Sequence, residues 1–131
     1  MRETNIPAHK YIGDLMKHVH YSEVELNLPK EKGIKDVMVR WLISNEDGAK
    51  NFAMRLFEIG PGGHSPWHQH EWEHEMFILE GEGTAVKADG EIDCRSGDAF
   101  FIEPWEWHNF KNTGKKTLKF LCLIPYLKKD K

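Results

Sequence analysis

The sequence has little cysteine, no long apolar run and no stretch of clustered positive charge. Cys94 and Cys122 are its only cysteines, they lie far apart, and no Cys-x-x-Cys pair occurs. Disulfide scaffolds and cysteine-based zinc sites need more cysteines at shorter spacing, so we expect two free thiols. No run of about 20 apolar residues is present to span a bilayer, and the polar N-terminus, M-R-E-T-N-I-P, does not read as a secretory signal. We therefore predict a cytoplasmic protein with no membrane partner.

Positive charge is sparse as well as scattered. The 131 residues include 18 Lys and Arg against 21 Asp and Glu, which gives a net charge of −3. The basic residues form no stripe longer than the C-terminal Lys128, Lys129 and Lys131. Because nucleic-acid binding needs a basic patch, we expect no nucleic-acid partner. The length and the 40% hydrophobic content suit one compact domain.

Short β-rich segments separated by glycine-containing turns occupy most of the chain. Strands are predicted at 36–44, 51–59, 76–80, 84–88, 91–95, 99–103 and 117–125. The sequence G-P-G-G at 60–63 is expected to end the second strand and turn. Residues 1–22 show no clean period and are predicted to form an N-terminal arm, with 23–131 as the single barrel domain. Many short strands at regular spacing are typical of an antiparallel sandwich or barrel.

Eight histidines are unusual for this length, and several of them are concentrated. His68 and His70 are two residues apart, so on a strand both side chains leave the same face. His74 follows across a short bend, and His108 lies on a segment that an antiparallel barrel can bring alongside. Three or four imidazoles from neighbouring strands are typical of a site for a first-row transition metal.

A second His-x-His pair provides a comparison within the chain. His18 and His20 have the same spacing, but no glycine turn precedes them and no third histidine lies close by in the sequence. We expect this pair not to bind a metal. Spacing alone therefore does not identify the site, since isolated strand histidines are often simply hydrogen-bonded.

Two segments containing the concentrated histidines resemble the two sequence motifs of the cupin superfamily. They read Gly62-(x5)-His68-x-His70-(x4)-Glu75-(x5)-Gly81 and Gly97-Asp98-(x4)-Glu103-Pro104-(x3)-His108-(x3)-Asn112. A hairpin of suitable length separates them, and the resemblance spans roughly residues 51–125. It implies an all-β, antiparallel double-stranded β-helix (a cupin jelly-roll barrel) with a metal inside.

The chain departs from the family pattern in two places. The usual fourth ligand is a glutamate three or four residues after the second histidine, where this chain has His74 and Glu75. The run W-E-H-E resembles small manganese-binding cupins in which a histidine takes that role, so the implied ligands are His68, His70, His74 and His108. Glu75 is the alternative fourth ligand. In the second motif Glu103 and Trp105 replace the usual proline and glycine.

The implied ligand set has chemical consequences. Four neutral imidazoles leave the charge of a divalent ion uncompensated, which favours a small and anionic substrate. Four protein ligands on an octahedral ion leave two positions open for chelation of substrate, or for substrate and O₂. Mn²⁺ or Fe²⁺ suits that use, and Zn²⁺ or Ni²⁺ can occupy the same nitrogens.

Further side chains are expected near the metal. The predicted lining of the pocket consists of Met54, Trp67, Phe101, Phe110 and Cys122, with ordinary core packing as the competing interpretation. Arg40 and Arg55 lie in the middle of predicted strands. An outward, solvated orientation is favoured for both, because a buried and unpaired cation is costly. An inward orientation would instead hold a substrate carboxylate.

These features favour a metal-dependent small-molecule oxygenase or oxidoreductase. One alternative is a metal-dependent lyase or isomerase, which needs a proton acceptor such as Glu58 or Glu103. The other is a non-catalytic cupin that binds a small ligand or a metal. The fold hosts many activities and does not choose among them. Small cupins resemble dimers in which an N-terminal arm crosses the interface, so we also predict a homodimer.

Overall fold

The computed structural model describes residues 16–127, and its regular structure consists of strands joined by short turns. The strands are β1 (Lys35–Ile43), β2 (Phe52–His64), β3 (His74–Glu80), β4 (Glu82–Lys87), β5 (Gly90–Arg95), β6 (Ala99–Ile102), β7 (His108–Lys111) and β8 (Leu118–Pro125). Two 3₁₀ turns, η2 (Tyr21–Glu23) and η3 (Asn45–Asp47), flank β1. No α-helix occurs in the part of the chain that the structure describes. The prediction of an all-β chain is confirmed.

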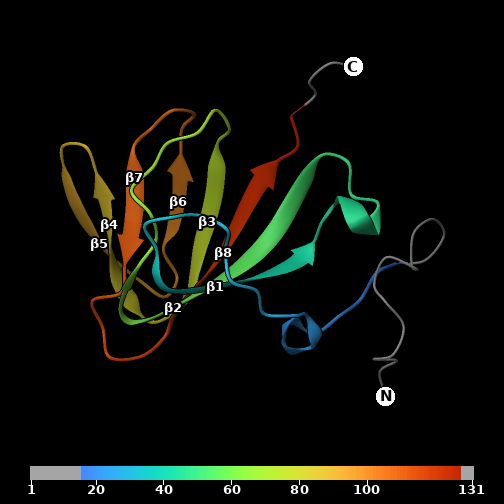
Figure 1. The fold of residues 1–131 in the computed structure, drawn as a ribbon, viewed down its shortest axis with the longest axis horizontal. Coiled ribbons are helices and arrows are strands. Elements are labelled where there is room, and N and C mark those ends of the chain that lie inside the picture. Colours follow the sequence, from blue (N-terminus) through green and yellow to red (C-terminus); the bar gives the residue numbers. More distant parts are fainter. Residues whose placement is uncertain (1–15, 128–131) are drawn as a thin grey trace.

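The strands form one strongly curled antiparallel sheet (Figure 1). Their order is β5-β4-β7-β2-β8-β3-β6, and β1 pairs with β2 beyond this path. Strands distant in the sequence are therefore neighbours: β8 lies between β2 and β3 over most of its length. This curling gives the sheet a concave inner face, onto which alternate residues of each strand project.

The predicted strands are all present, although their ends differ by a few residues. The largest difference is at G-P-G-G, which was expected to end a strand but lies within β2. Lys35 pairs with His64 whereas Val37 pairs with Ile59, so β2 accommodates extra residues in a bulge. Gly62 adopts a φ of 81° there, a backbone conformation that glycine reaches without strain. The glycines therefore bend the strand and let it continue.

Apolar side chains close the interior at one end of the curled sheet. Ile59, Ile78 and Leu118 are fully buried, and Ile59 lies directly opposite Leu118 in the register of β2 and β8. On β3, Ile78 is four residues beyond His74, which separates the packed end from the histidines by roughly 13 Å. The opposite end of the interior is left for polar side chains.

The segment before β1 runs across the open side of the sheet, as Figure 1 shows for the stretch leading into β1. A bridge between Asn27 and Val39 ties it to β1. Of the predicted arm, residues 1–15 lie outside the described residues, 16–20 have no regular structure, and 21–22 belong to η2. The boundary at residue 22 therefore stays a prediction. None of the described helices is long or apolar enough for a membrane span.

Candidate metal centre

Three of the histidines meet where the loop after β2 pairs with the start of β7. The backbone amide of His68 donates to the carbonyl of His108 at 3.2 Å, and His108 donates back at 3.0 Å. His70 lies two residues further on, so its ring faces the same side. Ring nitrogens of His68, His70 and His108 all lie within 4.8 Å of one another.

His74 completes the cluster from β3. Its Nε2 atom lies 2.7 Å from Nε2 of His70, and its ring centroid lies 5.5 Å from that of His108. Glu75 is exposed, on the opposite face of β3, where it pairs with Phe101 of β6. Because alternate residues of a strand face opposite sides, the structure brings His74 to the cluster and keeps Glu75 away from it.

Each of the four rings uses its Nδ1 atom to contact a group outside the cluster. The Nδ1 contacts are 3.0 Å from His68 to Oε2 of Glu31, 3.2 Å from His70 to the Trp72 carbonyl, 2.8 Å from His74 to Sγ of Cys122, and 2.7 Å from His108 to the Glu106 carbonyl. Metal-binding histidines almost always have such a partner on the nitrogen that does not bind. The arrangement leaves the Nε2 atoms for a metal.

The hydrogen-bond partners also decide where some of the protons are. Carbonyl oxygens only accept, so His70 and His108 carry their protons on Nδ1 and direct Nε2 lone pairs toward the cluster. One Nε2 atom of the His70–His74 pair must donate to the other. Metal uptake by both rings would therefore require that proton to move to the other nitrogen of its own ring, with no net proton release.

Burial keeps three of the four rings neutral near pH 7. Burial above all, with a smaller effect of the neighbouring imidazoles, lowers the pKa of His70 to about 4 and that of His74 to about 2. The pKa of His108 is lowered for the same reason. A hydrogen bond from His68 lowers the pKa of Glu31. Three rings are thus in the deprotonated form that binds metals near pH 7, with one carboxylate beside them.

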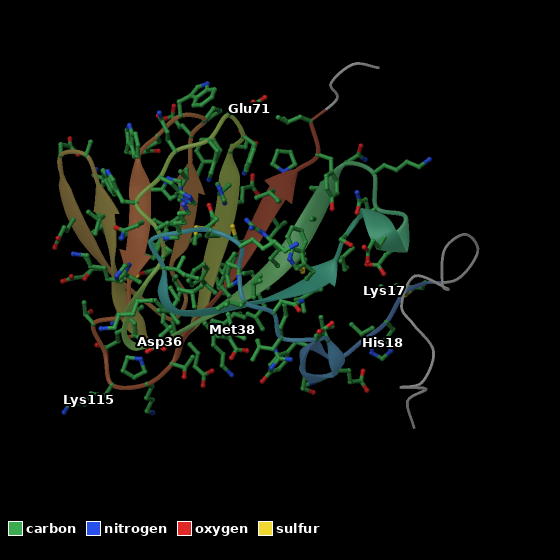
Figure 2. All side chains as sticks on the ribbon, in the orientation of Figure 1. Lys17, His18, Asp36, Met38, Glu71 and Lys115 are labelled. Carbon is green, nitrogen blue, oxygen red and sulfur yellow. The ribbon has the colours of Figure 1, made fainter. Side chains whose placement is uncertain are left out.

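The rings face a cavity of about 140 Å³. Its apolar wall includes Phe57, Met76, Phe110 and Phe120, and Ile34 contributes from the segment before β1. Glu71, labelled in Figure 2, lies in the loop between His70 and His74, at the end of the sheet opposite that of Lys115. A small cavity with mostly apolar walls and a few convergent polar groups is typical of a ligand site.

The comparisons agree with this architecture. The family model described as a cupin domain matches residues 55–124. The chain belongs to the cupin family. The match begins within β2 and ends within β8, so it contains all four clustered histidines.

Individual cupins similar to this chain have varied names. The solved structure of the polyketide cyclase RemF from Streptomyces resistomycificus is 35% identical, with a TM-score of 0.81 over 88% of this chain and 89% of that one. An oxalate-binding protein from Thermotoga maritima is 34% identical over 72% of this chain and 80% of its own length. A 1-methylthio-D-xylulose 5-phosphate methylsulfurylase from Rhodospirillum rubrum is 37% identical over 54% of this chain.

Coverage limits what some relatives imply. The chain spans 46% of the length of the methylsulfurylase. It spans 18% of each of two gentisate 1,2-dioxygenases, one from Aquipseudomonas alcaligenes at 33% identity and one from a Streptomyces species at 30%. The comparisons therefore show the family. They do not show one activity, because the similar proteins are named as a cyclase, a binding protein, a methylsulfurylase and dioxygenases.

Two of the predicted lining residues do face the cavity of this cupin. Phe110 and Cys122 are both part of its wall. Arg55 also lines it, contrary to the outward orientation favoured from the sequence, because Arg55 lies opposite Cys122 in the register of β2 and β8. Both side chains therefore project from the same face of the sheet.

The other three predicted lining residues are corrected by the structure. Met54 is adjacent to Arg55 on β2 and so projects from the other face. Phe101 is 57% exposed and Trp67 is 46% exposed, and Trp67 stacks on Trp107 with ring centroids 5.7 Å apart. These side chains lie outside the cavity, because strand phase, which the sequence pattern did not define, decides the face.

Glu31 was missed by the sequence analysis. It lies 37 residues before His68, to which it is hydrogen-bonded, and it belongs to neither cupin motif. Only the tertiary path of the segment before β1 brings the two together. Trp105, in contrast, occupies the position where the motif usually has glycine, and it keeps the corresponding positive φ of 65°. Its amide donates to the carbonyl of His70 at 2.7 Å, which couples this strained turn to the cluster.

Proposed function

We propose that this cupin is a metal-dependent small-molecule enzyme of the oxygenase or oxidoreductase class. Its ligands would be the Nε2 atoms of His68, His70, His74 and His108, and Mn²⁺ or Fe²⁺ is the favoured metal, with Zn²⁺ and Ni²⁺ as alternatives. The observation that carries the proposal is the satisfied Nδ1 atom on each ring, which orients all four imidazoles before a metal arrives.

The cavity residues support chelation of a small molecule. Phe57, Phe110 and Phe120 form an apolar wall of the cavity beside the cluster, and a wall that keeps water away strengthens polar interactions. The metal, when bound, supplies Lewis acidity and open coordination positions for substrate and dioxygen. The protein then orients the substrate and keeps the rings of His70, His74 and His108 neutral.

Proton acceptors in the cavity are few, which disfavours a lyase or isomerase. Glu58 is paired with Arg40 at 3.1 Å, and Glu103 is exposed. Neither lines the cavity, and among the lining residues within 16–127 the only carboxylate is Glu31. Because Glu31 is hydrogen-bonded to His68, it is better placed to orient the His68 ring than to accept a proton from the substrate.

The second candidate, although the cavity has few proton acceptors, is a metal-dependent lyase or isomerase in which the metal acts as a Lewis acid. The similarity to the polyketide cyclase RemF over 88% of this chain supports it. A non-catalytic binding role is the third candidate, supported by the relative named as an oxalate-binding protein. The two gentisate dioxygenases support the oxygenase proposal over a shorter segment.

Two measurements test the proposal. Metal analysis of protein purified without added ions should find a divalent transition metal, and the metal-free chain should take up Mn²⁺ or Fe²⁺. Oxygen consumption with small diketones, catechols and thiols should then require Fe²⁺ or Mn²⁺ and be absent with redox-inert Zn²⁺. Turnover that persists with Zn²⁺ and without oxygen uptake would favour the Lewis-acid candidate. A chain that takes up no metal would refute both metal-dependent enzyme functions and leave only the non-catalytic binding role.

We also propose that the chain is a cytoplasmic homodimer. Large apolar side chains are exposed on β1, β2 and the preceding segment, among them Leu28 at 67%, Phe52 at 55% and Trp41 at 39%. Such groups are typical of subunit contacts. Cys94 and Cys122 are both free thiols, which fits a reducing compartment. Sedimentation as a monomer would contradict the dimer.

A further inference from the structure

Arg55 is held rigidly in the wall of the histidine cavity. Its guanidinium carbon lies 4.8 Å from the ring centroid of Phe57 and 5.4 Å from that of Trp41, both within the range of cation–π contact. Its Nη2 atom donates to Sγ of Cys122 at 3.0 Å. The same sulfur contacts Nδ1 of His74 at 2.8 Å. The guanidinium is therefore only one side chain away from the cluster.

Most donors of this guanidinium have no hydrogen-bond partner among residues 16–127. The guanidinium carbon lies over two aromatic rings, and a guanidinium directs its five N–H groups outward in its own plane. One of them reaches Cys122, whose sulfur is a weak acceptor. The Nε atom is buried and makes no hydrogen bond. No carboxylate of residues 16–127 lies within 4.0 Å of Arg55.

Arg40, on the neighbouring strand β1, provides a comparison, because its guanidinium is engaged with protein groups. Its Nε atom donates to Oε2 of Glu58 at 3.1 Å and its Nη1 atom donates to the carbonyl of Val24 at 2.6 Å. Arg40 thus has both a counter-ion and a backbone acceptor. Within residues 16–127, Arg55 has no backbone acceptor and no carboxylate within 4.0 Å, although its charge helps to lower the pKa of Glu31 in the same cavity.

We propose that Arg55 is the anion anchor of the cavity and that the ligand is a small molecule carrying a carboxylate. This inference rests on the proposed function, since it places the rest of that molecule at the metal. A planar guanidinium fork matches the two oxygens of a carboxylate, and such paired, charge-assisted contacts are among the strongest that a protein makes. The free in-plane donors of Arg55 are the complementary half of that contact.

The volume and the charge of the cavity both favour a small anionic acid as the ligand. The cavity volume of about 140 Å³ is below the range of about 300–1,000 Å³ that is typical of sites for drug-sized ligands, so a compact acid fits better than a large one. A divalent ion on neutral imidazoles adds two positive charges to that of Arg55, and Glu31 cancels only one of the three. The loaded cavity is therefore net positive and attracts anions.

The test measures binding of oxalate to the Mn²⁺-loaded full chain by calorimetry, with the metal content checked after each titration. Arg55→Gln should weaken oxalate about 10- to 100-fold, the range for losing a charged hydrogen-bond partner, and should leave Mn²⁺ affinity unchanged. Arg55→Lys should give a smaller loss, because it keeps the charge without the fork. Arg95→Gln, the same charge change on the exposed end of β5, should bind oxalate as the wild type does.

Each contrary result has a distinct meaning. Equal oxalate affinity in the wild type and Arg55→Gln would overturn the proposal. So would a loss of Mn²⁺ affinity that matches the loss of oxalate, because Arg55 would then act on the metal through Cys122 and His74. Tighter binding of inorganic phosphate than of oxalate would overturn the carboxylate class.

Failure of the metal site is separable from failure of this inference. If the wild type takes up no metal, the proposed function fails, and the same titrations are made on the metal-free chain. An oxalate signal lost in Arg55→Gln and kept in Arg95→Gln would still support the anchor. A signal that is absent from the wild type, or insensitive to Arg55, would overturn it.

Discussion

The chain contains two His-x-His pairs, and the structure places them in opposite surroundings. His18 and His20 are exposed, and Nδ1 of His20 accepts from the amide of Ser22 at 3.2 Å, capping the short turn η2. His68 and His70 instead face a cavity together with two further imidazoles. The spacing is identical, so the difference arises from the strands that lie alongside the second pair.

The partners of the ring nitrogens show what this difference means. The partner of His20 is two residues away in the chain. Glu31 is 37 residues from His68, and Cys122 is 48 residues from His74. A ring held by its own turn stabilises that turn, whereas rings held by distant elements are oriented by the whole fold. Preorganisation of this kind is what a metal site requires.

The largest expected effect is the loss of metal affinity when a ring of the clustered pair is removed, compared with removal of a ring of the exposed pair. His70→Ala should weaken Mn²⁺ binding by more than about 100-fold, because losing a ligand exceeds the 10- to 100-fold cost of losing a supporting contact. His20→Ala should leave Mn²⁺ affinity unchanged and lower the free energy of unfolding by about 1 kcal/mol or less. Calorimetric Mn²⁺ titration and urea denaturation measure the two quantities. Equal metal affinities in the two variants would remove the distinction between the pairs.

The next effect separates the two candidates for the fourth ligand. His74→Ala should weaken Mn²⁺ binding about 100-fold, since its Nε2 atom lies in the cluster. Glu75→Ala should have no effect, because that side chain is exposed on the outer face of β3. The same titration compares them directly. A larger loss in Glu75→Ala would mean that β3 shifts register when the metal binds.

The fold and the clustering of the four histidines were largely predictable from the sequence, because alternation, turn chemistry and motif spacing are local. Two features were not local. The bulge at Gly62 hid the continuation of β2, and without the strand phase Met54 rather than Arg55 was predicted to face inward. Glu31 reaches His68 only through a long-range path, for which the sequence carries no spacing signal.

Acidification should destabilise the metal-free chain through the buried cluster. The pKa of His74 falls from 6.5 to about 2 on folding, so between these values the unfolded chain binds more protons. Stability is therefore complete above pH 6.5 and decreases as the pH falls, by about 1.4 kcal/mol per pH unit for one histidine. Between pH 6.5 and pH 5, His74 alone should contribute a loss of about 2 kcal/mol.

Urea denaturation across this pH range checks the prediction. His74→Gln should flatten the dependence, and His20→Gln, at the exposed pair, should keep the wild-type slope. Stability that rises on acidification would contradict the burial of a neutral ring at this position. A wild-type slope in His74→Gln would mean that other groups dominate the pH dependence.

The smallest expected effect concerns Glu31, the carboxylate that is hydrogen-bonded to His68. Its carboxylate accepts from Nδ1 of His68 at 3.0 Å, which makes Nε2 of that ring a better metal ligand. Glu31→Gln should therefore weaken Mn²⁺ binding about tenfold, while Glu25→Gln, an exposed control in the same segment, should not. Because Glu31→Gln also removes the one negative charge of the cavity, oxalate should bind its Mn²⁺-loaded form more tightly, opposite in sign to Arg55→Gln. Weakening of both ligands would instead mean that Glu31 acts by holding the segment before β1 in place.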